Sequence, residues 1–398
     1  MKLAIISDFH IGYERFRSDA YNQAEEALSK AAELADAIII PGDIFDFRTP
    51  KPDVIAEGIS LFRSIANKPL GGKVISFKSR GKSRTYTTLP VIAIAGTHER
   101  RAAGEENPVS LLNLAGFVVD VSDGTAVVAK GNEQVAITGV GGIAEEHFRE
   151  YLKKTEIRPV QGMFNVFMFH QSIYELLPFS KDFIHYDELP EGFDLYVDGH
   201  IHNRVEATVH GKPFIIPGST VLTQLKEAEQ ESKGFYIFDT ADNSFKFYRI
   251  NSRRFVVRKI DISNMEPGQI KEAIVDAVKT AEGGKKDMPI VLVQLSGSVK
   301  QGFKLGDINL STIPKELADV AIVEINGAGL EEAGIIANDF EKEIENLSVR
   351  DFGMGLFTDI LSKQGYSLSV SPTKLFEILS SDSKEKAVKN ALAALFGE

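Results

Sequence analysis

The feature that most constrains this chain is a series of short apolar runs, each of which ends at side chains that can bind a metal ion. The first run, residues 3–7, leads directly into Asp8 and His10. Later runs lead into four further groups, which are Gly42-Asp43, Gly96-Thr97-His98-Glu99, His170 and Gly199-His200-Ile201-His202. Short apolar runs predict buried strands, and open α/β sheets present ligands at the carboxyl ends of such strands. The series therefore predicts an α/β fold with a polar site along a sheet edge.

Strands and helices are predicted to alternate in the first quarter of the chain. Apolar runs at residues 2–7, 37–41 and 91–95 predict buried strands, and residues 20–35 and 52–66 have apolar side chains at helical spacing. The polar, glycine-punctuated residues 73–88 predict an extended loop or hairpin. Further short strands are predicted at 117–121, 126–129, 134–138, 165–169, 195–197, 204–209, 212–216, 234–239 and 244–249. Two packed sheets with flanking helices are the expected architecture.

A chain of 398 residues is too long for one typical core, so two or three domains are expected. We place the first domain at residues 1–253. Residues 254–327 predict a small α+β domain, with strands at 256–262, 289–295 and 320–325 and a helix at 267–281. In residues 328–398, helices are predicted at 331–347, 374–379 and 383–396. These short helices form either a small subdomain or a surface that docks on a partner.

The composition excludes several kinds of site. Cysteine is absent, which excludes disulfides and thiolate-bound metals. No apolar run approaches the roughly 20 residues that span a membrane, and the sequence shows no secretory signal pattern. A cytoplasmic protein without a membrane partner is therefore expected.

One segment differs in charge from the rest of this acidic chain. The formal net charge of −11 argues against indiscriminate nucleic-acid binding. Between residues 58 and 98, however, aspartate and glutamate are absent. The basic side chains of this stretch include Lys73, Lys78, Arg80, Lys82 and Arg84. They are predicted to contact DNA phosphates, and the alternative is an ordinary solvated loop.

The residue types at the strand ends fit a site for two metal ions. Five of the eight histidines lie there, together with Asp8 and Asp43. Two ions about 3.5–4 Å apart need a carboxylate that reaches both of them. Nitrogen and oxygen ligands without sulfur suit Mn, Fe or Zn. Two divalent ions bring a charge of +4, and the two aspartates with a metal-bound hydroxide bring −3, so the remaining +1 suits one phosphodiester anion. Phosphoester hydrolysis is therefore the predicted chemistry.

The histidines are assigned by their positions. On an extended segment, His200 and His202 would point their rings to one side. His98 follows its strand by a few residues, so it is predicted to protonate the leaving oxygen or to donate to the phosphate in the transition state. The other three, His147, His185 and His210, lack a strand end before them and are predicted to be structural.

Together these residues resemble the calcineurin-like metallophosphoesterases. Within that superfamily, residues 1–253 resemble the nuclease of the double-strand-break repair complex, the Mre/SbcD family. The motifs that carry this narrower resemblance are Gly42-Asp-Ile-Phe-Asp46, Gly104-Glu-Glu-Asn-Pro108, Phe169-His-Gln-Ser172, Pro217-Gly-Ser-Thr220 and Lys233-Gly-Phe-Tyr236. The resemblance implies a four-layer β-sandwich metallophosphoesterase fold, followed by a capping domain and C-terminal helices.

The resemblance also implies an activity and partners. It implies an Mn²⁺-dependent nuclease, with 3′→5′ exonuclease activity on double-stranded DNA and endonuclease activity on single strands. It further implies a nucleoid-associated homodimer that repairs double-strand breaks with a coiled-coil ABC-type ATPase of the SbcC/Rad family. By motif, one ion would be held by Asp8, His10, Asp43 and His202. The other would be held by Asp43, His170 and His200, with Asp43 bridging.

One position departs from the family pattern. Where the family has an asparagine ligand, this chain has Thr97. Its hydroxyl is a neutral oxygen on a shorter arm, so Thr97 or a water that it holds is predicted to complete the second site with weakened affinity. Two other functions stay open, an enzyme for small phosphoesters and an inactive scaffold that recruits an ATPase. The basic segment, the extra domain and the C-terminal helices favour the nuclease.

Overall fold

The computed structural model describes residues 1–66, 73–79, 89–102, 105–178, 180–281 and 288–330, with only the backbone described for 73–79. These residues form two compact units. The first comprises Met1–Arg258, Ile274–Val293 and Leu310–Ile325, and the second comprises Lys259–Ala273, Gln294–Asn309 and, among the described residues, 326–330. The domain boundaries after residues 253 and 327 stay predictions. The predicted helices at 331–347, 374–379 and 383–396 lie outside the described residues.

The first sheet carries the alternation of strands and helices. It has six strands in the order β13-β12-β1-β2-β4-β5. These are β1 Lys2–Ile5, β2 Ala37–Ile40, β4 Val91–Ala93, β5 Val119–Asp120, β12 Gly234–Asp239 and β13 Ser244–Arg249. The strands β1, β2, β4 and β5 pair in parallel. The helices α1 (Arg17–Leu34) and α2 (Pro52–Ile65) lie in the connections, which confirms the predicted β-α-β-α-β order.

A second sheet has seven strands in the order β10-β11-β9-β8-β7-β6-β3. These are β3 Lys73–Ser79, β6 Asp123–Lys130, β7 Glu133–Val140, β8 Phe164–Phe169, β9 Leu195–Asp198, β10 Val205–Val209 and β11 Lys212–Ile216. Its middle strands β7, β8, β9 and β11 pair in parallel. Both sheets therefore have parallel strands whose carboxyl ends can carry ligands.

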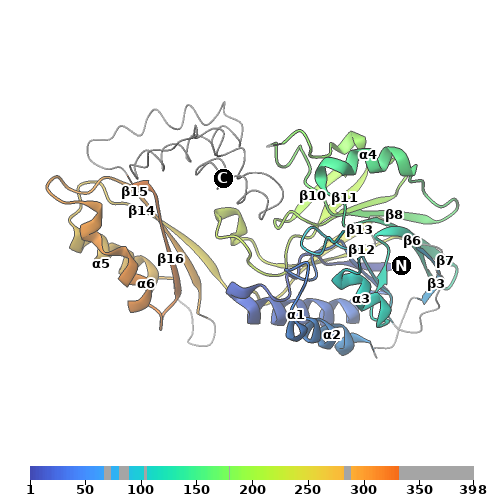
Figure 1. Ribbon diagram of the computed structural model, residues 1–398, viewed down its shortest axis with the longest axis horizontal. Helices are drawn as coiled ribbons and strands as arrows, with labels where there is room; N and C mark the ends of the chain where they lie inside the picture. Colours follow the sequence, from blue (N-terminus) through green and yellow to red (C-terminus); the bar gives the residue numbers. More distant parts are fainter. Residues whose placement is uncertain (67–72, 80–88, 103–104, 179, 282–287, 331–398) are drawn as a thin grey trace, which may run out of the picture. The chain divides into compact units, whose positions relative to one another are not determined.

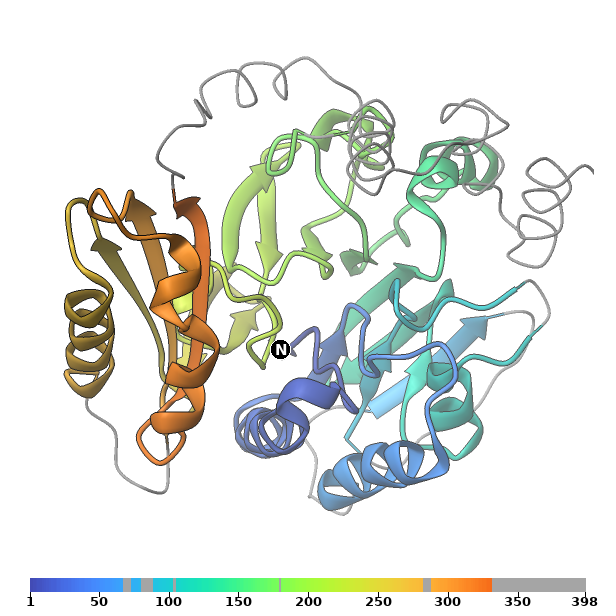
Figure 2. The ribbon, with the colours of Figure 1, turned by 60° about the vertical axis from the view of Figure 1, so that its left-hand side comes forward.

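The sheets and their helices stack in four layers, with α1 and α2 below the sheets and α4 above them in Figure 1. On the outer face of the first sheet, Leu61 of α2 shares a core with Ile38. The two sheets face each other through side chains such as Ile39 and Ile137. On the outer face of the second sheet, α4 (Glu145–Thr155) buries Phe148. Figure 2 shows the same sandwich from another direction. Its mixed sheets with flanking helices confirm the predicted α/β fold class.

Two helices of the sandwich were not predicted from the sequence. The helix α3 (Pro108–Leu114) has only 7 residues, and Asn107 caps it by accepting a hydrogen bond from the Ser110 N–H at 2.8 Å. Of the 11 residues in α4, only Phe148 and Leu152 are buried. Short helices depend on tertiary packing more than on their own propensity, so their sequences give a weak periodic signal.

A small third sheet has the order β14-β15-β16, formed by β14 Phe255–Asp261, β15 Ile290–Gly297 and β16 Ile322–Leu330. The helices α5 (Pro267–Lys279) and α6 (Ile313–Glu316) belong to the same stretch of chain. Single 3₁₀ turns occur at Glu14–Phe16, Tyr186–Glu188, Glu227–Gln230, Leu305–Ile308 and Leu310–Thr312. Within the described ranges, every helix is too short or too polar to cross a membrane.

Candidate metal centre

Ligand candidates from both sheets meet where parallel strands end. Asp8 and Asp43 follow β1 and β2 of the first sheet, and His170 follows β8 of the second sheet. Backbone hydrogen bonds tie these strand ends together, since the Asp8 N–H donates to the Gly42 carbonyl at 3.3 Å. Across the sheets, His170 Nδ1 lies 2.7 Å from the Pro41 carbonyl oxygen. The site is therefore built from main chain that two sheets hold in place.

The backbone is left-handed at several candidate ligands. The φ angle is 53° at Asp8, 49° at His10, 49° at Asp43 and 67° at His200. Such angles cost non-glycine residues about 1–3 kcal/mol each and gather at functional sites. The expected extended conformation of the segment from His200 to His202 is therefore wrong, because the chain turns sharply at His200.

Glycines beside these turns leave space that a side chain would fill. A Cβ atom on Gly96 would lie 2.2 Å from Asp43 Oδ1. On Gly199 it would lie 2.2 Å from the Pro41 carbonyl oxygen. Both contacts are too short for any real side chain, so the glycines before Thr97 and His200 are required by the close approach of neighbouring strand ends.

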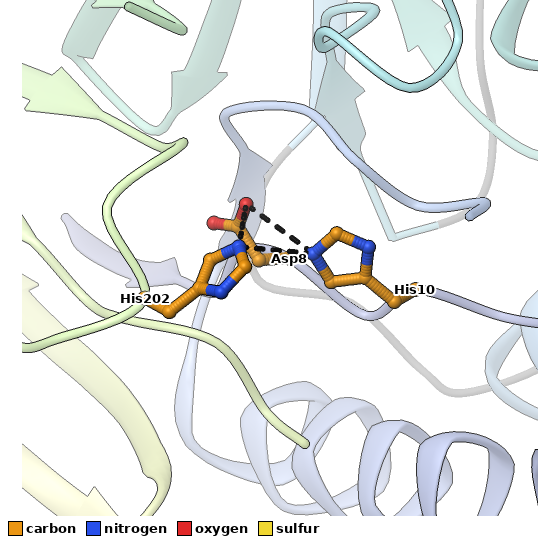
Figure 3. Close-up of side chains that lie close together, drawn as sticks. All are labelled: Asp8, His10 and His202. Carbon is orange, nitrogen blue, oxygen red and sulfur yellow. Dashed lines mark hydrogen bonds and ion pairs between the residues drawn. The ribbon is translucent and has the colours of Figure 1, made fainter. Parts of the chain in front are cut away.

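The first group of ligand candidates is Asp8, His10 and His202 (Figure 3). The Nε2 atoms of the two histidines lie 3.2 Å apart. Asp8 Oδ1 lies 3.9 Å from Nε2 of His10 and 3.8 Å from Nε2 of His202. Both Asp8 carboxylate oxygens are buried without a hydrogen-bond partner in the described part of the chain. An unpaired buried carboxylate is costly, and a cation between these three side chains would remove that cost.

A second group joins Asp8 to Asp43 and His170. His170 Nε2 lies 3.2 Å from Asp43 Oδ2, and Asp43 Oδ1 accepts a hydrogen bond from the His98 N–H at 2.9 Å. Close to this group, the Thr97 hydroxyl lies 3.4 Å from His200 Nδ1. The two carboxylates thus lie between the two sets of histidines, where a bridging ligand is needed.

His10 and His170 each use their outer ring nitrogen to fix the orientation of the ring. His10 Nδ1 lies 2.9 Å from Asp46 Oδ1, and His170 Nδ1 lies 2.7 Å from the Pro41 carbonyl oxygen. Both partners are acceptors, so each Nδ1 carries a proton, and each Nε2 is the nitrogen that can bind a metal ion after losing any proton of its own. Metal-binding histidines commonly hold their second N–H in this way.

His202 and His200 have similar partners. His202 Nδ1 forms a hydrogen bond with the Thr223 hydroxyl. His200 Nε2 lies 3.5 Å from Glu145 Oε1, which leaves His200 Nδ1 as the nitrogen that faces Thr97. The Asp46, Thr223 and Glu145 side chains were not predicted as site residues. Of these three, only Asp46 could have been found from the sequence, because it lies three residues after Asp43 in the Gly42–Asp46 motif.

The charges of the surrounding side chains favour an ion pair between His170 and Asp43. Burial lowers the pKa of His170, but the charges of Asp43 and Asp8 outweigh burial and raise this pKa to about 10. Burial raises the pKa of Asp43, but the charge of His170 outweighs it and holds this pKa below its usual range. A metal ion that binds here therefore displaces a proton.

His200 and His202 are neutral, as imidazole ligands must be. Burial and the charge of His170 lower the pKa of His200 to about 4. Burial and the charge of His10 lower the pKa of His202 well below its ordinary value. Their rings are thus ready to bind a cation without losing a proton first.

His98 lies beside the ligand candidates but differs from them in exposure. Its side chain is 44% exposed, and its ring centre lies 4.9 Å from that of His10. His98 Nδ1 lies 2.9 Å from the Asp46 carbonyl oxygen and 3.4 Å from Asp46 Oδ1. Among the described residues, Nε2 of His98 has no hydrogen-bond partner, so it is free to meet a substrate. The neighbouring Glu99 is buried and accepts from the Phe45 and Gly96 N–H groups, which fixes this loop.

The Asp46 side chain lies 2.9 Å from His10 Nδ1, so its removal should weaken the metal site, whereas the main-chain contact of Asp46 with His98 remains. In Asp46→Ala we expect the affinity for Mn²⁺ to fall about 10–100-fold, because His10 loses the acceptor that orients its ring. Equilibrium titration with Mn²⁺ measures this effect. The matched control is Asp53→Ala, which removes an exposed carboxylate that pairs with Arg17. Equal affinities in the two variants would contradict this role of Asp46.

The other predicted residues lie outside these groups. The backbone of Lys73 and Lys78 belongs to β3, at the edge of the second sheet. Arg80, Lys82 and Arg84 lie outside the described residues. Of the three histidines predicted to be structural, His210 bonds to the Leu189 carbonyl through Nε2 at 2.9 Å, His185 contacts Glu175 at 3.2 Å, and His147 is exposed on α4.

Comparisons with known proteins find relatives of this chain. The chain is 30% identical over 259 residues to "Double-strand break repair protein MRE11" of Encephalitozoon cuniculi, which covers 60% of this chain and 45% of that protein. It is 26% identical over 317 residues to "DNA double-strand break repair protein Mre11" of Sulfolobus acidocaldarius, covering 75% and 76%. With the protein of the same name from Sulfurisphaera tokodaii, it is 24% identical over 334 residues, covering 81% and 76%. The chain thus spans less than half of the first relative and about three quarters of the other two.

A family model covers the part of the chain that holds most of the candidate ligands. The model is described as calcineurin-like phosphoesterase, and it matches residues 1–204. This range contains every member of the two carboxylate and histidine groups built on Asp8. Because the match extends over more than half of the 398 residues, the chain belongs to the calcineurin-like phosphoesterases.

Proposed function

We propose that this protein is an Mn²⁺-dependent DNA nuclease of the Mre/SbcD type. It would act as a 3′→5′ exonuclease on double-stranded DNA and as an endonuclease on single strands in double-strand break repair. The observation that carries this proposal is the extent of the similarity to proteins named Mre11, which covers 75–81% of the chain in two relatives. That similarity extends beyond the phosphoesterase match at residues 1–204.

Two divalent ions fit the donors of the site. Asp8, His10 and His202 would hold the first ion, and His170 and His200 would hold the second. Asp43 would bridge them. Nitrogen and oxygen donors without sulfur suit Mn²⁺. When bound, a pair of such ions supplies an activated water at neutral pH and neutralises charge on the phosphate.

The side chains of this protein would then orient the substrate and move the proton. His98 Nε2 is free and half exposed, so it can donate a proton to the oxygen that leaves the phosphorus. Asp46 holds the opposite nitrogen of the same ring through its carbonyl oxygen at 2.9 Å. This contact keeps one proton on Nδ1 and aims Nε2 away from Asp46, so the proton that Nε2 transfers is the second proton of the imidazolium form.

Thr97 sets the affinity for the second ion. Its hydroxyl lies 3.4 Å from His200 Nδ1, close enough for both atoms to contact one ion. In Thr97→Asn we expect tighter binding of the second ion, because the longer side chain brings a carbonyl oxygen to the site. Titration with Mn²⁺ resolves the two binding events. Thr97→Ala should weaken the second event, and a tight second ion that is unchanged in Thr97→Ala would show that Thr97 is no ligand.

The basic stretch around β3 would bind DNA phosphates. In the triple variant Lys78→Ala, Arg80→Ala, Lys82→Ala, the dependence of log K on log salt should become shallower by about 0.9 for each phosphate that the protein no longer binds. Duplex binding measured between low and moderate salt gives this slope. A matched triple replacement of exposed lysines on other surfaces, Lys30, Lys154 and Lys212, is the control. An unchanged slope in the first variant would remove these residues from the DNA interface.

Assembly with partners is part of the same proposal. Leu111 and Leu114 of α3 are 40% and 52% exposed, and they form a small apolar face that a second copy can cover in a homodimer. The helices predicted in residues 328–398 are proposed to bind a coiled-coil ABC-type ATPase. A protein of this kind would work in the cytoplasm on the DNA of the nucleoid. Sedimentation of the full chain, alone and with the ATPase, tests both contacts.

An assay with two substrates separates this function from the alternative enzyme. A nuclease should have a much higher kcat/KM for duplex DNA than for a small chromogenic phosphodiester, and DNA should compete with the small substrate. An enzyme for small phosphoesters would show the opposite preference, and DNA would leave its rate unchanged.

A further inference from the structure

A buried ion pair lies behind His202 and belongs to neither group of ligand candidates. Lys233 Nζ contacts Glu229 Oε2 at 2.5 Å, and these side chains are only 7% and 4% exposed. Lysine and glutamate are rarely buried to this extent. Lys233 directly precedes β12, and Glu229 lies in the 3₁₀ turn at Glu227–Gln230.

Lys233 contacts the main chain that presents His202. Its ammonium group donates to the Ser219 hydroxyl at 2.9 Å and lies 3.4 Å from the His202 carbonyl oxygen. The Ser219 N–H donates to the same His202 carbonyl at 3.1 Å, and the Thr220 N–H donates to the Asp8 carbonyl at 3.2 Å. One short loop and one buried cation therefore hold the backbones of two ligand candidates together.

Glu229 is close to the other side of the His202 ring. Its Oε1 atom lies 3.8 Å from His202 Nδ1, the nitrogen that also bonds to the Thr223 hydroxyl. A hydroxyl can either donate or accept, so Thr223 alone does not decide where the imidazole proton lies. The negative charge of Glu229 favours the proton on Nδ1, which leaves Nε2 free to face Asp8 and His10.

Stability alone does not explain such a pair. Burying two charges costs free energy that their attraction barely returns, and apolar side chains of similar size often stabilise a protein more. The pair lies directly against a ligand candidate rather than elsewhere in the core. Its position therefore points to a role in the presentation of His202.

We propose that Lys233 and Glu229 are positioning residues for the first metal ion. Lys233 fixes the backbone of His202 through its carbonyl group and Ser219, and Glu229 selects the tautomer whose Nε2 can bind the ion. The inference rests on the proposed role of Asp8, His10 and His202 in metal binding. It gives a role to the Pro217–Thr220 and Lys233–Tyr236 motifs, which contain none of the candidate metal ligands.

The test uses the full chain with three variants, which are Glu229→Gln, Lys233→Met and the two combined. Lys233→Met alone leaves Glu229 unpaired in the interior and destabilises the fold, so the neutral double variant carries the test. In each variant we expect the affinity for the first Mn²⁺ ion to fall about 10–100-fold. The affinity for the second ion should change by less than about threefold, because the pair does not contact Thr97 or His200 in the described structure.

A spectroscopic measurement separates positioning from simple stabilisation. In the metal-free protein labelled with ¹⁵N-histidine, the His202 ring should show the shifts of an Nδ1–H tautomer. In Glu229→Gln and in the double variant, these shifts should move towards a mixture of tautomers. The control is Lys212→Met, which breaks an exposed ion pair with Asp194. It should change neither the affinity for the first ion nor the ¹⁵N shifts of the His202 ring.

The outcomes distinguish this inference from the proposed function. A folded double variant that keeps the tautomer and binds the first ion as tightly as the wild type would overturn the positioning role, even if its Tm is changed. If the wild-type protein itself binds no divalent ion, both the inference and the proposed function are wrong. Loss of the first ion alone, with the tautomer shifted, supports the inference.

Discussion

Asp43→Ala is expected to lose both metal ions and to reduce kcat/KM for DNA at least about a thousandfold. Asp43 is buried, and one carboxylate oxygen lies 3.2 Å from His170 Nε2. The other oxygen accepts a hydrogen bond from the His98 N–H. Removal of this side chain therefore takes away the proposed bridge and loosens the loop that carries the proposed acid. Metal content by mass spectrometry and the rate on duplex DNA measure the two effects together.

The matched control for Asp43 keeps its size and removes its charge. Asp43→Asn can still accept the His98 N–H through its amide oxygen, so the loop should stay in place. It offers only one oxygen to metal ions, and we expect at least one ion to be lost with most of the activity. Retention of both ions in Asp43→Ala would contradict the bridging role, because both ions would then be held without the Asp43 carboxylate.

His98→Ala should abolish most of the activity while both metal ions stay bound. Loss of a general acid lowers kcat by about 10²–10⁴-fold. The metal content should be unchanged, because His98 is proposed as the acid and not as a ligand, and its Nδ1 bonds to the Asp46 carbonyl. KM should change little, since the scissile phosphate would still be held by the ions. This combination separates His98 from residues whose loss removes a metal.

The control for His98 is another exposed histidine on the same sandwich. His147 lies on α4 and is not part of either ligand group. His147→Ala should keep both kcat and the metal content. If His98→Ala lost an ion, His98 would be a ligand instead of an acid. If it kept its full rate, the proton would come from another group.

Most of the architecture around the site could be predicted because continuous apolar runs in the sequence indicate which strands are buried. The runs that became β1, β2 and β8 are largely apolar, and an aspartate or a histidine follows each of them within three residues. Runs of this kind predict strands that are buried on both faces, and such strands place the next residues at a sheet edge. The helices α1 and α2 between these strands were predicted from apolar side chains at helical spacing.

The orientation of the ligand candidates could not be predicted, because it depends on contacts between distant parts of the chain. His10 is held by Asp46, and His202 is held by Thr223 and lies near Glu229. The two bonded pairs lie 36 and 21 residues apart along the chain, so no local pattern predicts them. The left-handed backbone at His200 is likewise set by its surroundings, which is why an extended segment was wrongly expected there.

The most direct test of the central proposal is a time course on blunt duplex DNA labelled at its 3′ end. With Mn²⁺, the full chain should release the label as a mononucleotide from the first time points. EDTA should stop the release, and His98→Ala should slow it about 10²–10⁴-fold. If the label stayed on the DNA while the same protein hydrolysed a small chromogenic phosphodiester, the site would be that of a phosphoesterase for small substrates and the proposed nuclease would be contradicted.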